Sequence, residues 1–231
     1  MGNSIEDNIN KIFNEIPDSV KVVGAAKSQS PLDVKKAVEA GLEIIGENYI
    51  KDAKEVYHRI KDKAQLHFIG IPDKAKHDLL RRKNLKRFDM IETINSVEIA
   101  EELNDMCAKI DKVMPILIEI NSGEEKQKAG VLPDDTIEVV KEISKLKNIK
   151  VKGLMTMGST PHQSMEDPKD RERAKKCFKR TKELFDEIRK LEITNVEMKY
   201  LSMGMSNSYQ IAIKEGANMI RVGSKIFGSR N

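Results

Sequence analysis

Short apolar runs alternate with longer amphipathic runs along the whole chain. The apolar runs begin near Val20, Glu43, Leu66, Met90, Val113, Val151, Val196 and Asn218. The first five starts are about 23 residues apart, a fair length for one strand, one helix and two short loops. The pattern therefore predicts eight strands that alternate with helices.

The segments between these runs have helical periodicity. PLDVKKAVEAG, residues 31–41, opens with proline and closes with Gly41, the order that helices prefer. NSVEIAEELNDMCAKI, residues 95–110, and RERAKKCFKRTKELFDEIRKLE, residues 171–192, each carry one apolar stripe at three- and four-residue spacing. We expect a helix in each of these segments.

Alternating strands and helices imply parallel strands joined by helical crossovers. The simplest fold is a single-domain α/β protein, a (β/α)8 TIM barrel over residues 1–231, because this length is ordinary for one barrel. A doubly wound open sheet is the structural alternative. The chain contains neither the GxGxxG nor the P-loop pattern that would favour that alternative.

Composition narrows the class of protein. Hydrophobic residues make up 39% and charged residues 34%, which fits a folded and charge-rich protein. The net charge of +4 is compatible with an anionic small ligand but too small to indicate nucleic acid. The sequence has no signal peptide and no apolar stretch near the roughly 20 residues that cross a bilayer. We expect a cytoplasmic protein without a membrane partner.

Cysteine and histidine spacing gives no support for a metal site. Cys107 and Cys177 form no CxxC pair, which favours free thiols in a reducing compartment. The four histidines form no HxH or HExxH pair: His58, His67, His77 and His162.

Polar residues gather at the expected carboxyl ends of the strands, where barrels carry their functional sites. They are Lys27, Glu47, Asn48, His67, Thr93, Asn95, Asn121, Thr156 and the segments LSMGMS and RVGS. The strand bodies between them stay apolar, which is the expected layout of a ligand site.

Lys27 ends the apolar run VKVVGAAK on the first predicted strand. Apolar surroundings disfavour the charged form of an amine and leave its lone pair free to attack a carbonyl. Such a lysine can form a Schiff base, including one with pyridoxal 5'-phosphate. The structural alternative is a lysine that extends its amine to water at the strand end.

The last two predicted strands offer an anion site. The segment LSMGMSNSYQIAIKEG predicts a strand, a turn and a helix, with Ser206 as the N-cap and Gly216 as the helix stop. The segment NMIRVGSKIFG predicts the eighth strand, which ends at Gly223 and Ser224. Barrels commonly hold phosphate on the loops after strands seven and eight. The structural alternative is that Ser206 only caps a helix and Gly223 only forms a turn, without a bound anion.

Arg221 precedes Gly223 by two residues and shares its strand face. A guanidinium donates hydrogen bonds and accepts none. If Arg221 faced a pyridine nitrogen, it would keep that nitrogen unprotonated. The ring would then be a weaker electron sink than a ring whose nitrogen is paired with an aspartate.

Several motifs together resemble the pyridoxal phosphate homeostasis protein family, the YggS/PROSC type of pyridoxal phosphate-binding protein. In chain order they are VVGAAKS, GENYIKDA, LHFIG, GLMTM, CFKRTKELFDEI, LSMGMSNSYQIAIKEG and RVGSKIFGSR. They run from about Val20 to Arg230, and the specificity lies in their combination.

The resemblance implies a barrel like the N-terminal domain of alanine racemase, with pyridoxal 5'-phosphate bound as a Schiff base on Lys27. It assigns the phosphate to Ser206, Gly223 and Ser224 and the pyridine nitrogen to Arg221. Ser202 and Asn48 belong to motifs at the same rim.

Two segments depart from the family pattern. After HFIG the family continues with Gln, a variable residue, Asn and Lys, whereas this chain has Asp73 and Ala75 in place of the glutamine and asparagine and keeps only the lysine, as Lys76. Any role of that glutamine and asparagine is therefore in doubt. The loop NSGEEKQKAG is about one residue longer than the common form, which leaves the matching position of Lys128 open.

The family implies a carrier or regulator that buffers or delivers pyridoxal phosphate to apo-enzymes, with no catalytic residues. Alanine racemase adds a second domain with a catalytic tyrosine, but this chain stops at Asn231, and its tyrosines lie inside the barrel pattern: Tyr49, Tyr57, Tyr200 and Tyr209. We therefore expect cofactor binding without efficient turnover. A single-domain amino-acid racemase or decarboxylase is the alternative.

A third possibility comes from KAKHDLLRRKNLKR, residues 74–87, which carries seven Lys and Arg residues against one acid. Such a segment can bind RNA or an acidic partner. Because no aromatic residue interleaves for base stacking, we interpret it as a solvated helix face and expect no nucleic acid.

Overall fold

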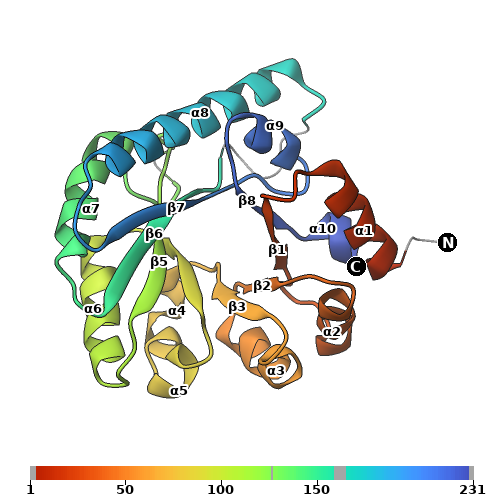
Figure 1. Cartoon of the computed structure of the whole chain (residues 1–231), viewed down its shortest axis with the longest axis horizontal. Coiled ribbons are helices and arrows are strands. Elements are labelled where there is room, and N and C mark those ends of the chain that lie inside the picture. Colours follow the sequence, from red (N-terminus) through yellow and green to blue (C-terminus); the bar gives the residue numbers. More distant parts are fainter. Residues whose placement is uncertain (1–3, 126, 159–164, 229–231) are drawn as a thin grey trace.

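Eight parallel strands form a closed barrel in the computed structural model, which describes residues 4–125, 127–158 and 165–228. The strands pair in chain order, and β8 pairs with β1 (Figure 1). They are β1 (Lys21–Ala25), β2 (Ile44–Glu47), β3 (Gln65–Phe68), β4 (Met90–Ile94), β5 (Met114–Glu119), β6 (Ile149–Thr156), β7 (Val196–Met203) and β8 (Met219–Val222). Every predicted strand is present and starts within two residues of its predicted start, so the barrel is confirmed and the open sheet is wrong.

Helices surround the strands, and α8 is the long one across the top of Figure 1. They are α1 (Ile5–Glu15), α2 (Pro31–Glu39), α3 (Ile50–Ile60), α4 (Pro72–Leu79), α5 (Arg82–Leu85), α6 (Val97–Ala108), η1 (Pro133–Asp135, a 3-10 turn), α7 (Thr136–Ser144), α8 (Pro168–Lys190), α9 (Tyr209–Lys214) and α10 (Ser224–Phe227). Side chains of Ser30, Ser96 and Asp167 accept hydrogen bonds from the first turns of α2, α6 and α8. These local signals fix the helix starts that the periodicity predicted.

The core has two layers because successive strand residues point to opposite sides of the barrel wall. Between the wall and the helices lies the larger layer, which includes Ile45, Phe68 and Leu154. Inside the barrel lies a smaller cluster: Val23, Ile44, Met90, Leu117, Met155 and Met219. This inner cluster forms the floor beneath the carboxyl ends of the strands.

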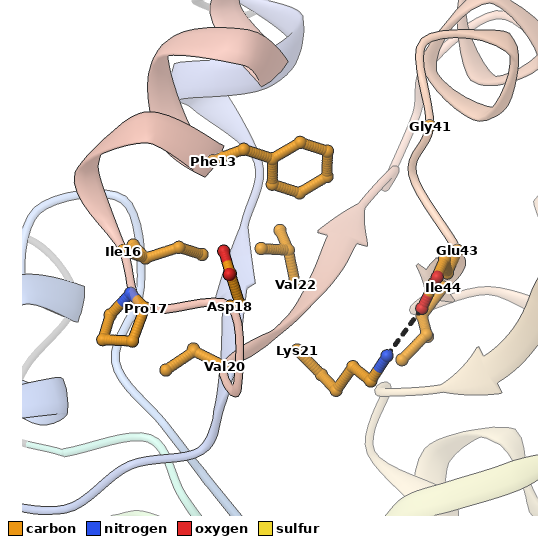
Figure 2. Close-up of a pocket in the computed structure, with 10 residues that line it drawn as sticks. All are labelled: Phe13, Ile16, Pro17, Asp18, Val20, Lys21, Val22, Gly41, Glu43 and Ile44. Carbon is orange, nitrogen blue, oxygen red and sulfur yellow. Dashed lines mark hydrogen bonds and ion pairs between the residues drawn. The ribbon is translucent and has the colours of Figure 1, made fainter.

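The amino end of the barrel also has a cavity, of about 290 Å³, between α1 and the starts of β1 and β2 (Figure 2). Lys21 and Glu43 form an ion pair of 2.8 Å at its edge, and Phe13 extends over it. In barrels this end contributes to stability and the opposite end carries function.

Candidate functional site

The first and last strands meet closely at the carboxyl end of the barrel. Val23 pairs with Arg221 and Gly24 with Val222. A Cβ on Gly223 would lie 3.0 Å from the Ala25 carbonyl oxygen, a tight contact, so this approach favours glycine. Lys27 lies two residues beyond Ala25, and therefore shares one rim with the end of β8.

Lys27 stands in a sharp turn between β1 and α2. Ser28, the next residue, adopts a left-handed backbone with φ of 61° and donates its N–H to Asp52 of α3 at 3.0 Å. The Lys27 side chain is half-buried, and its Nζ lies 5.3 Å from the ring centroid of Tyr49. The amine is thus held against an exposed aromatic ring rather than enclosed by apolar side chains, a cation–π contact that orients it.

Ser206 is not the N-cap that the sequence predicted. Helix α9 begins at Tyr209 with Ser208 as its N-cap residue. The Ser206 hydroxyl instead accepts hydrogen bonds from the backbone N–H groups of Gly223 at 3.2 Å and Lys225 at 3.4 Å. Ser206 is buried and Ser224, which opens α10, is exposed. Tertiary packing, rather than a local cap, therefore gathers one hydroxyl and two N–H donors at this point.

Arg221 lies inside the barrel with 4% of its surface exposed. Its Nη1 donates to the carbonyl oxygen and the hydroxyl of Ser202 at 2.9 and 2.8 Å. Its Nη2 donates to the Thr156 carbonyl at 2.8 Å and to the Met157 sulfur at 3.7 Å, so four of the five guanidinium N–H groups are used. The Nε–H group makes no hydrogen bond to the described residues. Arg221 is therefore rigidly held, with one donor left for a ligand.

A buried acid and histidine support Arg221 from below. Glu92 accepts from the Ser202 hydroxyl at 2.8 Å and contacts Nδ1 of His67 at 2.7 Å. The other ring nitrogen of His67 lies 3.2 Å from Oε1 of Gln65. Burial alone would raise the pKa of Glu92, but the His67 hydrogen bond and the charges of His67 and Arg221 outweigh it and lower this pKa. Glu92 is thus an ionised counterion for Arg221.

Burial lowers the pKa of Arg221, while Glu92 and Glu119 act in the opposite direction. Arginine remains a cation under such conditions because its ordinary pKa is so high.

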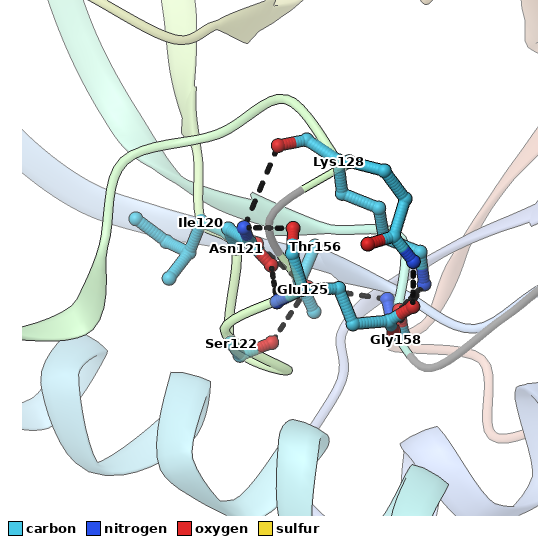
Figure 3. Close-up of polar contacts among 8 residues, drawn as sticks. Ile120, Asn121, Ser122, Glu125, Lys128, Thr156 and Gly158 are labelled. Atoms are coloured by element: carbon cyan, nitrogen blue, oxygen red, sulfur yellow. Dashed lines mark hydrogen bonds and ion pairs between the residues drawn. The ribbon is translucent and has the colours of Figure 1, made fainter.

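Asn48 and Lys128 lie on other parts of the rim. The Asn48 amide donates to the Ile69 carbonyl at 3.2 Å. Lys128 pairs with Glu125 at 2.6 Å and donates to the Gly158 carbonyl at 3.0 Å (Figure 3). Lys128 is thus part of a loop framework.

Two residues of the segment after HFIG, the departing Asp73 and the matching Lys76, make contacts of their own. Asp73 accepts from Asn95 at 2.8 Å, and Lys76 pairs with Glu102 of α6 at 2.5 Å. Both contacts connect α4 to its neighbours and bring neither side chain to Lys27.

Sequence reasoning missed Glu92 and Glu119, which point into the barrel from β4 and β5. Each is an acid within an apolar strand, MIETI and ILIEI, and that interruption was the signal that could have found them. Glu47, in contrast, was predicted on the rim but faces the helix layer, where Asp52 and Glu55 of α3 act on it.

No group of three or more His, Cys, Asp and Glu side chains suited to a metal exists among the described residues, a range that excludes His162. Within the same range, no helix is both long and apolar enough to span a membrane.

Comparison with known proteins gives the family. The family model for the alanine racemase N-terminal domain matches residues 2–231. A pyridoxal phosphate homeostasis protein of Aquifex aeolicus is 34% identical over 211 residues, covering 91% of this chain and 87% of the relative. The chain belongs to the pyridoxal phosphate homeostasis protein family.

Solved structures of similar fold agree with this family assignment. PipY of Synechococcus elongatus, solved with pyridoxal phosphate bound, superposes with a TM-score of 0.82 at 23% identity, covering 97% of this chain and all (100%) of PipY. An alanine racemase of Clostridium difficile superposes with a TM-score of 0.79 at 19% identity, covering 98% of this chain and 57% of the racemase. At these identities the superpositions establish a shared fold.

Proposed function

We propose that this homeostasis-family barrel binds pyridoxal 5'-phosphate as a Schiff base on Lys27 and buffers or delivers it to apo-enzymes without efficient turnover. The single observation that carries the proposal is the placement of Lys27, Arg221 and the Ser206 donor group on one rim, across the closure between β1 and β8. The name that the relatives carry, pyridoxal phosphate homeostasis protein, supports a regulatory role over a catalytic one.

The residues fit the parts of this cofactor. The N–H groups of Gly223 and Lys225 converge on the Ser206 hydroxyl, and a phosphate oxygen can accept from the same three donors. Ser224 contributes the start of α10 beside them. The unbonded Nε–H of Arg221 suits the pyridine nitrogen, and Ser202 fixes the guanidinium plane. Asn48 follows β2, the strand that pairs with β1, and so stands on the rim beside the Lys27 turn.

When bound, pyridoxal phosphate supplies a reactive aldehyde and an electron-withdrawing ring. Arg221 limits the electron-withdrawing property. Its guanidinium, kept charged by Glu92, can only donate a hydrogen bond to the ring nitrogen, so that nitrogen stays unprotonated and the ring withdraws electrons less strongly. The half-buried setting of Lys27 leaves its amine within reach of water and of incoming molecules, which favours exchange of the cofactor over tight retention.

Mass spectrometry before and after borohydride reduction tests the proposal. The chain incubated with pyridoxal phosphate should gain one covalent adduct that peptide mapping places on Lys27. Lys27→Ala should lose it, and the matched variant Lys21→Ala, at the start of β1 on the other end of the barrel, should keep it. An adduct retained in Lys27→Ala would refute the assignment.

Two further variants test the remaining contacts. Ser206→Ala and Arg221→Lys should still form the adduct but release the cofactor faster on dialysis, because they weaken phosphate and ring contacts alone. Delivery is tested by mixing the loaded protein with an apo-transaminase and measuring the recovery of transaminase activity. Turnover of L-alanine to D-alanine near one per second would favour the racemase alternative.

A further inference from the structure

A cavity of about 300 Å³ opens at the same end of the barrel, over the ends of β2 to β6. Of the residues assigned to the cofactor, Asn48 alone lines it. Its apolar lining consists of Ile69, Ile71, Ile120, Ala129 and Met157. Volume and lining are in the range of a site for a small molecule.

The loop wall of this cavity has its polar groups already paired. Asn121 bonds the loop backbone at Glu125, with distances of 3.0 and 3.2 Å (Figure 3). Ser122 and Thr156 share a hydrogen bond of 2.8 Å, and Lys128 is paired with Glu125. The polar side chains of this wall are therefore held in place by bonds to one another and to the loop backbone.

Three residues that line the cavity carry side-chain oxygens without hydrogen bonds to the described residues. Among the described residues, Glu119, 7% exposed, has no side-chain hydrogen-bond partner, and the buried Thr93 Oγ1 has none either. Asn48 turns its amide N–H toward Ile69, and its side-chain carbonyl oxygen has no hydrogen bond within the described part of the chain. Buried polar groups of this kind are normally satisfied, so an N–H-rich ligand is the natural complement.

Charges around Glu119 favour a cation in the same place. Burial raises the pKa of Glu119 to about 7, with Arg221 lowering it and Asp73 raising it. Lys128 is neutralised by Glu125, and Arg221 by Glu92. A carboxylate that is costly to ionise when alone gains most from an incoming positive charge.

We propose that this cavity binds a small primary amine as its ammonium ion, with N–H groups donated to Glu119, Asn48 and Thr93 and a short apolar tail against the isoleucines. An ammonium has three donors for these three oxygens and makes charge-assisted hydrogen bonds to the carboxylate. The site does not require bound pyridoxal phosphate, but it lies on the rim where that cofactor's aldehyde would meet an amine.

Calorimetric titration of the cofactor-free chain with n-butylammonium chloride tests the site. The unmodified protein should bind this probe, and n-butanol and tetramethylammonium should bind at least about tenfold more weakly, because one lacks the charge and the other the N–H donors. Affinity should rise about tenfold per pH unit between pH 5 and 7 and level off above 8, since the ammonium displaces a proton from Glu119 below its pKa.

Variants assign the binding to its residues. Glu119→Gln should weaken the probe at least about tenfold and remove the pH dependence, and Thr93→Val should weaken it less. Glu124→Gln, the same change at an exposed acid on the neighbouring loop, should bind normally. Urea midpoints confirm that each variant is folded.

Equal affinity in Glu119→Gln, equal binding of n-butanol, or an affinity independent of pH would each overturn the proposal. Because the titration uses protein without pyridoxal phosphate, its failure is distinct from a failure of the Lys27 adduct. A chain that forms the adduct and does not bind the amine would overturn the amine site and leave the proposed function intact.

Discussion

Glu47 gives a prediction that the structure makes quantitative. It is the last residue of β2, it is fully buried, and neither carboxyl oxygen has a hydrogen-bond partner among the described residues. Burial, with Asp52 and Glu55 of α3, raises its pKa from 4.5 to about 8. In the folded chain Glu47 is therefore protonated at neutral pH, whereas in the unfolded chain it is ionised.

The consequence is a loss of stability as pH rises. Between pH 4.5 and 8 the folded chain holds a proton at Glu47 that the unfolded chain has released, so the free energy of unfolding falls with pH. Each pH unit is worth about 1.4 kcal/mol. Between pH 5 and 8 the contribution of Glu47 should therefore fall by about 3 kcal/mol, and it should be constant above the folded pKa and below the unfolded one.

Urea unfolding of the unmodified chain and of Glu47→Gln, at half-unit steps from pH 5 to 8.5, measures this term. The difference in unfolding free energy between the two proteins should change by about 3 kcal/mol in favour of the variant, because glutamine does not titrate. Other groups that titrate in this range, Glu119 among them, cancel in the difference. Glu101→Gln, at an exposed acid of α6, should give a constant difference. A constant difference for Glu47→Gln as well would refute the reasoning.

Three further predictions concern the core. Glu92→Gln should cost about 3–5 kcal/mol in urea unfolding at pH 7, since it leaves buried Arg221 without its counterion; a loss under about 1 kcal/mol would contradict that role. Gly153→Ala should lower stability by about 1–3 kcal/mol more than Gly228→Ala, measured by thermal melting. Both glycines have positive φ, but a Cβ at Gly153 overlaps a carbonyl of β7 and one at Gly228 meets open space. Burial raises the pKa of Cys107 to about 11, so its thiol should react with a disulfide reagent at pH 8 only after denaturant is added.

Much of the fold was predictable because its signals are local. A run of apolar residues such as those of β5 and a capped amphipathic segment such as α6 can be recognised from neighbours within one turn or one strand. The alternation of such segments then restricts the topology to right-handed parallel crossovers. Lys27 at a strand end and the glycine at the end of β8 were recognisable for the same reason.

The contacts of the site needed the tertiary structure. Ser206 resembled a helix cap because a helical segment comes soon after it in the sequence, whereas its partners, Gly223 and Lys225, come from another element. The sequence predicted an amine of Lys27 enclosed by its apolar strand. In the structure the amine is half-buried and lies over Tyr49, because the turn into α2 and its contact with α3 place it there.

The chain sequence by itself determined which segments become strands and helices, and so which residues stand at strand ends. Only the closed barrel decided which of these residues meet. Glu92 and His67 became a support for Arg221, and Glu119 part of the lining of a cavity, because closure brings β3, β4, β5 and β8 around one interior. Charge pairing and burial depend on distances across that interior, which no local pattern encodes.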